Sequence, residues 1–211
     1  MKKVIYGVLA FAALTFTACG GADSTEEVAE DITEEVVVAT YTIDPDNSKL
    51  EWFGSWTGGQ NDGNKHNGII KIADGTMFQD GDKFHGHFAI DMASIEVLDI
   101  DEASGKPKLE GHLASEDFFN VAQYAATDVK FIEYNEGNAK IAILVAGSIL
   151  ERTVPVTLEV KGDVLKLEGN FSVDFTEVGM VGMTVKPEKP EEGAVSTEID
   201  FKLHIELKKK I

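Results

Sequence analysis

Residues 199–208 read IDFKLHIELK, a run in which apolar and polar side chains alternate without a break. In an extended strand, every second side chain points to the same face. One face of this segment is therefore apolar and the other is polar or charged, which is typical of a strand that lies between a core and water. The run predicts a half-buried β-strand near the end of the sequence.

The same period of two extends back through the chain to Tyr41. It is clear in residues 84–92, 141–149 and 165–175, and glycine, asparagine and aspartate recur between the apolar runs. These residues favour the turns of β-hairpins, and no alternation of strands with helices is visible. We expect an all-β domain of about eight antiparallel strands, closed into a barrel because closure removes exposed strand edges.

Only residues 115–124 interrupt this pattern. Ser115 can cap a helix whose first turn carries two acidic residues, and Phe118 and Phe119 follow as apolar cover. We therefore expect one short helix here.

The first residues have the features of a secretion signal. Lys2 and Lys3 precede an uncharged apolar run at residues 4–16. A helix of that length spans about 20 Å, which is short of the roughly 30 Å hydrocarbon core of a bilayer. Small residues surround Cys19, as in the lipobox at which bacterial lipoproteins are cleaved and acylated.

An ordinary cleavage site with an incidental cysteine is the alternative. Cys19 is the only cysteine, and an exported protein has little use for an unpaired exposed thiol, so lipidation is favoured. We expect a signal peptide at residues 1–18, a lipidated, disordered acidic linker at 19–40 and the barrel domain at 41–211. The protein would be exported and lipid-anchored to a bacterial membrane, at a periplasmic or outer-membrane face.

The charge of the chain limits its partners. Its formal net charge is −18, and residues 19–40 contain seven acidic residues and no basic one. Such a field repels phosphate backbones, which argues against nucleic acid as a partner. A neutral or apolar ligand is compatible with it.

The search for catalytic residues yields one pair of interest. His85 and His87 share one face of a strand, a spacing that can hold zinc. Phe84 and Phe88 share the opposite face, so the histidines face solvent if the phenylalanines point inward. No nucleophile elbow or phosphate-binding glycine loop is present. We expect no enzyme activity, no metal and no cofactor.

Three motifs carry a resemblance to a known family. YTID at residues 41–44, IDMASI at 90–95 and LASEDFFNV at 113–121 are similar to motifs of the YceI-like family, the polyisoprenoid-binding or lipid-binding domain of exported bacterial proteins. Ala125 stands where the family has proline, and Phe175 stands where a basic residue is common. These departures imply a barrel rim, and a ligand choice, that differ from those of other members.

The resemblance implies a lipocalin-like barrel that binds a polyisoprenoid, or another long-chain amphiphile, in an apolar lumen. The leading hypothesis is non-catalytic binding, storage or transfer of such a lipid near the membrane. The alternative is a structural lipoprotein with a packed barrel that binds a partner protein by its outer surface, and a homodimer is left open. The residues expected to line the lumen are Trp52, Ile72, Phe84, Phe88, Ile90, Phe119, Phe131, Ile143, Val145, Phe171, Val173, Leu203 and Ile205.

Overall fold

The computed structural model describes residues 38–210. The predicted signal peptide, Cys19 and the linker up to residue 37 lie outside this range. None of the described helices is long and apolar enough to cross a membrane.

The described chain folds into eleven strands and one α-helix, with short 3-10 turns between them. All strand pairs are antiparallel. The strands are β1 (Val38–Ile43), β2 (Lys49–Thr57), β3 (Lys65–Asp80), β4 (Lys83–Val97), β5 (Ala126–Asn135), β6 (Asn138–Val145), β7 (Ser148–Pro155), β8 (Thr157–Lys161), β9 (Val164–Asp174), β10 (Ala194–Val195) and β11 (Glu198–Lys209). The α-helix is α1 (Lys106–Ala114), and the 3-10 turns are Pro45–Asn47, Gly59–Asn61, Glu102–Ser104, Thr176–Val178, Val181–Met183 and Pro190–Glu192.

At two positions in the barrel wall, a single strand position is occupied by two consecutive strands with a short interruption between them. β1 and β2 are separated by the 3-10 turn at Pro45–Asn47, and both pair with β3 on one side and β11 on the other. β7 pairs with β6, and β8 pairs with β9. Only Val156 lies between the end of β7 and the start of β8. Apart from the short β10, the eleven strands therefore form eight wall positions.

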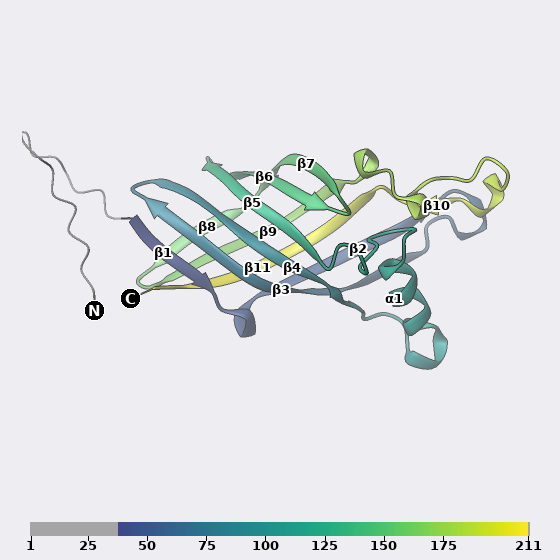
Figure 1. The fold of residues 1–211 in the computed structure, drawn as a ribbon, viewed down its shortest axis with the longest axis horizontal. Coiled ribbons are helices and arrows are strands. Elements are labelled where there is room, and N and C mark those ends of the chain that lie inside the picture. Colours follow the sequence, from purple (N-terminus) through teal and green to yellow (C-terminus); the bar gives the residue numbers. More distant parts are fainter. Residues whose placement is uncertain (1–37, 211) are drawn as a thin grey trace, which may run out of the picture. The chain divides into compact units, whose positions relative to one another are not determined.

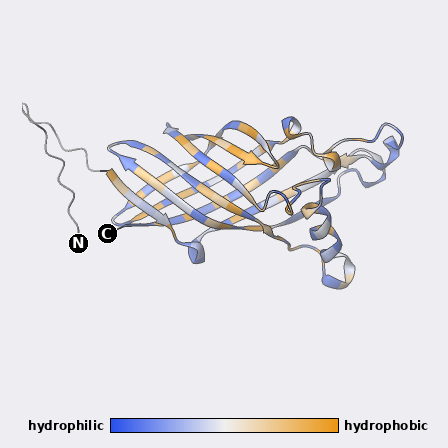
Figure 2. Ribbon diagram, viewed as in Figure 1, coloured by the Kyte–Doolittle hydropathy of each residue, from blue (hydrophilic) through white to orange (hydrophobic). Residues whose placement is uncertain are grey.

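These eight positions follow the order of the chain, and the last one, β11, pairs with the first. The wall is closed between β6 and β9 by the β7–β8 strand (Figure 1). Apolar and polar residues alternate along the wall strands (Figure 2). The all-β antiparallel barrel expected from the sequence is thus confirmed.

The position predicted for the helix is wrong. α1 spans Lys106–Ala114, and Ser115 ends it instead of starting it. The Ser115 hydroxyl donates a hydrogen bond to the carbonyl of His112 at 2.7 Å, while Pro107 occupies the first turn, where proline fits well. Residues 115–124 continue as turns, with Asn120 in the left-handed region at φ 45°.

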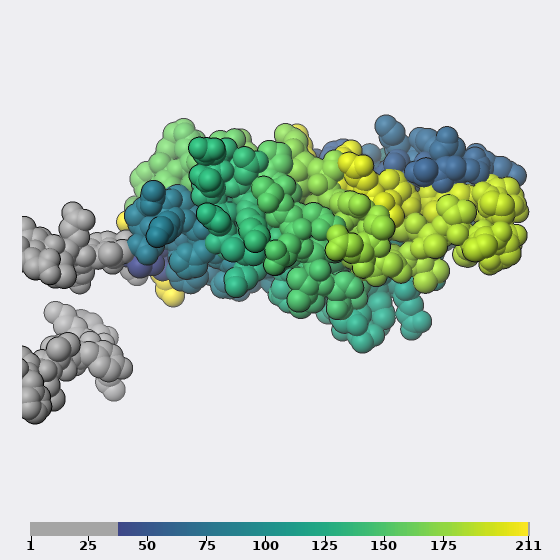
Figure 3. Space-filling model, turned by 90° about the horizontal axis from the view of Figure 1, so that it is seen from above, coloured from purple at the N-terminus to yellow at the C-terminus, as the bar shows by residue number. Residues whose placement is uncertain are grey.

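The barrel has two distinct ends. One carries the β3–β4, β5–β6 and β8–β9 turns together with the start of β1, and we call it the closed end. The other carries α1 and the long connection between β9 and β11 (Figure 1). At this second end β10 pairs with β2, and the Trp56 indole donates a hydrogen bond to the carbonyl of Glu192 at 2.8 Å. Figure 3 shows the end of β2 and the connection between β9 and β11 side by side.

Candidate functional site

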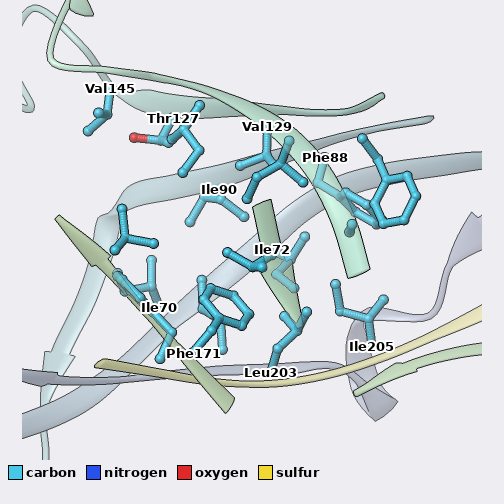
Figure 4. A pocket seen from close by; sticks show the side chains of 18 of the residues that line it. Ile70, Ile72, Phe88, Ile90, Thr127, Val129, Val145, Phe171, Leu203 and Ile205 are labelled. Carbon is cyan, nitrogen blue, oxygen red and sulfur yellow. The ribbon is translucent and has the colours of Figure 1, made fainter. Parts of the chain in front are cut away.

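The interior of the barrel contains an apolar cavity of about 140 Å³, which we call the lumen (Figure 4). Its lining comes from β2 to β7, β9 and β11, and from the segment after α1. No titratable side chain is among the lining residues, and all of them are apolar except Thr127. Such a space offers contacts to hydrocarbon and no group for acid–base chemistry.

Eleven of the thirteen residues expected in the lumen line it. They come from inward-facing positions of six strands and from the segment after α1. Contact of any of them with a ligand stays a prediction. These residues are Ile72, Phe88, Ile90, Phe119, Phe131, Ile143, Val145, Phe171, Val173, Leu203 and Ile205.

Trp52 is buried but lies outside the lumen. Its ring lies against β3 at Gly68, where an added Cβ would come within 2.7 Å of the ring and 1.9 Å of the carbonyl oxygen of Glu96. Glycine is therefore required at that position. Trp52 lines a separate pocket of about 270 Å³ at the α1 end, together with Trp56 and Phe118.

Phe84 also lies outside the lumen, because it is too near the closed end. The β4–β5 ladder ends at the pair Gly86–Phe131, and Phe84 lies beyond it. Its half-buried ring packs edge-to-face against Tyr134, with ring centroids 6.4 Å apart. Phe84 therefore packs against Tyr134 of β5 and not against the lumen.

Twelve further residues line the lumen and were not predicted. Most of them lie on the same alternating faces as the predicted ones, so the period of two could have identified them. Thr127 carried no such signal, because a polar residue breaks the apolar alternation. The twelve are Leu50, Ile70, Met92, Thr127, Val129, Ala139, Ile141, Val154, Val156, Leu167, Phe175 and Phe201.

Packed side chains block the lumen at the closed end. Tyr41, Met77, Leu165 and Leu207 are each at most 2% exposed and do not line the cavity. They are neighbours in the ladders, since Tyr41 pairs with Met77 and Leu207 pairs with Leu165. This layer separates the lumen from water.

At the α1 end of the barrel, two loop segments contact each other. Residues 115–124 and 176–183 meet there, and we call them together the cover. The backbone N–H of Gly182 donates a hydrogen bond to the carbonyl of Asp117 at 2.8 Å, which joins the two segments. Phe119 lines the lumen, whereas Phe118 packs against Gly182 and is 4% exposed.

The two histidines of β4 lie on the outer face of the barrel, as predicted from the phenylalanines on the opposite face of the strand. His85 and His87 are exposed, and His85 stacks on Phe78 with ring centroids 5.3 Å apart. Within residues 38–210 no group of three or more His, Cys, Asp or Glu side chains could hold a metal ion.

Comparison with known proteins assigns the family. The sequence model of the YceI-like domain matches residues 41–207. BcnA of Burkholderia cenocepacia is 15% identical, with 78% of this chain and 98% of that chain covered and a TM-score of 0.51. A polyisoprenoid binding domain from Saccharophagus degradans, implicated in plant cell wall breakdown, is 10% identical, with 81% and 98% covered and a TM-score of 0.56.

At these identities the two structures show a shared fold. A search of curated proteins finds no match. Because the domain match extends over most of the chain and the architecture agrees with it, the chain belongs to the YceI-like domain family.

Proposed function

We propose that this protein binds a long-chain lipid, a polyisoprenoid or a similar amphiphile, in its lumen and stores or carries it without chemical change. The observation that carries the proposal is the lining of the lumen, which is apolar at every position except Thr127. Burial of hydrocarbon against such walls contributes about 25 cal/mol per Å² of apolar surface removed from water. The Saccharophagus degradans domain described as polyisoprenoid-binding has the same fold, which supports this choice of ligand.

The volume of the lumen is too small for a long-chain lipid unless some of the lining side chains move. Its volume is about 140 Å³. An apolar cavity of about 150 Å³ accommodates a molecule the size of benzene, so a long chain needs more room than these side chains leave. Phe119, Phe171 and Phe201 line the lumen and are only partly buried. We infer that these rings turn aside when a chain enters.

Uptake from vesicles tests this proposal. The full chain is incubated with phosphatidylcholine vesicles that contain a tritiated long-chain polyprenol, and protein and vesicles are then separated. We expect the label to move with the protein up to about one lipid per chain. No transfer of label above that of a protein-free control would refute lipid binding.

We further propose that a lipid on Cys19, followed by the acidic linker, holds the barrel near a membrane. A tether raises the local concentration of a binding domain near its source of ligand. Among the described residues, β1 begins at the closed end, opposite the cover. Labelled palmitate should enter the wild-type chain but not Cys19→Ala, which should appear in the soluble fraction. A Cys19→Ala chain that stays membrane-bound would contradict the anchor.

One observation favours the alternative, a lipoprotein that binds a partner protein by its outer surface. Leu144 and Ile149 pair directly across β6 and β7, and they are 42% and 69% exposed. An exposed aliphatic pair on a barrel wall is a candidate contact for a protein partner. If this were the main function, Leu144→Ser with Ile149→Ser would remove it, whereas filling the lumen would not.

A further inference from the structure

The pocket of about 270 Å³ at the α1 end differs from the lumen in the chemistry of its walls. Both tryptophans of the chain, Trp52 and Trp56, line it, and we call it the tryptophan pocket. The ring of Phe118 and several aliphatic residues complete its apolar part. Its polar lining residues are Ser55, Asn61, Asn64, His66 and His112.

The tryptophan pocket lies next to the lumen. Leu50 and Trp52 are two residues apart on β2 and so face the same side of the strand. Leu50 lines the lumen, whereas Trp52 lines the tryptophan pocket. The consecutive residues Phe119 and Phe118 divide between the two cavities in the same way. The two cavities are therefore neighbours, and Trp52 and Phe118 lie where one meets the other.

Trp52 carries a hydrogen-bond donor that the protein does not use. Its side chain is buried, with 8% of the residue exposed. Within residues 38–210, its indole Nε1 is the one buried side-chain nitrogen or oxygen without a hydrogen-bond partner. Neighbouring atoms cover this N–H, so a ligand would reach it by a turn of the ring. A buried donor without a partner costs free energy, which an acceptor on a ligand would recover.

The charges around the tryptophan pocket restrict the ligand group that fits there. Among the described residues that line it there is no lysine or arginine. His66 Nδ1 lies 2.9 Å from Asp99 Oδ2, and His112 Nε2 lies 3.2 Å from Asp117 Oδ2, so both imidazoles already face a carboxylate. A phosphate would meet these carboxylates without a basic partner of its own. A neutral group with acceptor oxygens suits the asparagine amides and the indole N–H.

We propose that the tryptophan pocket binds the polar end of the amphiphile, a neutral group with hydrogen-bond acceptor oxygens, while the apolar chain passes Trp52 into the lumen. The polar end then lies among polar side chains, which the lumen does not offer. This inference rests on the proposed lipid-binding function and specifies where the polar end of the ligand lies and its chemical class.

Tryptophan fluorescence reports on this pocket, because both tryptophans line it and neither lines the lumen. The full chain is titrated with dodecanol that carries bromine either beside its hydroxyl group or at the far end of its chain. Bromine quenches tryptophan emission only at short range. Displacement of a fluorescent apolar dye measures binding of each probe in parallel.

We expect bromine beside the hydroxyl group to quench the emission strongly, and bromine at the far end to quench it much less. Equal quenching by the two probes, or stronger quenching by the far-end bromine, would overturn the assignment of the polar end and leave lipid binding intact. If neither probe displaces the dye or quenches the tryptophans, the proposed function itself fails.

The charge of the polar end is tested with dodecyl phosphate. We expect it to bind at least about tenfold more weakly than dodecanol, because no lysine or arginine among the described residues lines the tryptophan pocket. Binding of the phosphate as tight as that of the alcohol would overturn the neutral class of ligand.

Two variants test the polar groups of the pocket, and circular dichroism verifies that each is folded. Trp52→Phe removes the indole N–H and keeps an aromatic ring, and Asn64→Ala removes an amide. In each we expect the affinity for dodecanol, relative to dodecane, to fall about three- to tenfold, the effect of one neutral hydrogen bond. Asn170→Ala removes an amide at an exposed position of β9 outside both cavities and should keep the wild-type ratio. Wild-type ratios in both pocket variants would overturn the proposed hydrogen bonding.

Discussion

The ring of Phe118 lies directly on the backbone of Gly182, so that a Cβ added at Gly182 would be 2.1 Å from Cζ of the ring. Such a distance is far below van der Waals contact, and glycine is the one residue that fits there without displacement of the ring. The contact joins the two segments of the cover over the lumen. The geometry of the cover thus depends on the absence of a side chain at Gly182.

Gly182→Ala should loosen the cover. The added methyl collides with Phe118, and overpacking of this kind costs about 1–3 kcal/mol. We expect a lower melting temperature and faster release of a bound lipid, measured by stopped-flow displacement of a fluorescent dye.

The matched control is Gly111→Ala in α1, where an added Cβ meets no atom within 4 Å. It should be neutral, or stabilise the helix by up to about 1 kcal/mol, and leave release unchanged. Release from Gly182→Ala at the wild-type rate would mean that the cover does not limit exchange.

Leu203→Trp should reduce lipid binding without unfolding the barrel. Leu203 lines the lumen and is partly buried, so the larger ring can occupy the space that a ligand needs. We expect at least about a tenfold loss of affinity, equivalent to about 1.4 kcal/mol. Leu144→Trp makes the same change on the outer face, at a position that is 42% exposed, and should bind as the wild type does. Equal binding by both variants would place the ligand outside the lumen.

Leu207→Ala should affect stability more than binding. Leu207 is fully buried in the layer at the closed end and does not line the lumen. Truncation of a buried leucine costs about 2–5 kcal/mol, which denaturant unfolding would measure. The folded fraction should retain wild-type affinity, and a loss of affinity in fully folded protein would show that the closed end takes part in binding.

The ion pair between Asp44 and Lys208 should make stability depend on pH in the acid range. Lys208 Nζ lies 2.6 Å from Asp44 Oδ2, and this hydrogen-bonded contact, with a second from Asn47, lowers the pKa of Asp44. A lowered pKa adds stability above the unfolded value of about 4, and this stability is lost as the pH falls through the lower folded value.

Melting temperatures between about pH 5 and pH 2 test this effect. The wild type should lose more stability over that range than Asp44→Asn, which has no carboxylate to titrate there. Parallel losses in the two proteins would mean that Asp44 does not contribute.

The sequence predicted the walls of the barrel well, because alternation of apolar and polar residues reports directly which face of a strand is buried. It placed the helix wrongly, since Ser115 suits either end of a helix and only the fold shows that Pro107 lies in the first turn. Trp52 and Phe84 were assigned to the lumen because alternation gives the face of a residue and not its depth along the barrel axis. Both are inward-facing but lie beyond the cavity.

The existence of the lumen could not be predicted from the pattern of residues. A packed core and a hollow one require the same inward apolar faces, and the difference depends on how the side chains of opposite walls meet.

The most direct test of the central claim is to identify what the lumen contains after purification from a bacterial host. The full chain and its Leu203→Trp variant would be purified without added lipid, examined by native mass spectrometry and extracted with organic solvent. Lipid binding in the lumen predicts a long-chain amphiphile at up to about one per chain in the wild type, and much less in the variant. A wild-type chain that carries no lipid and takes up none when it is offered would contradict the account.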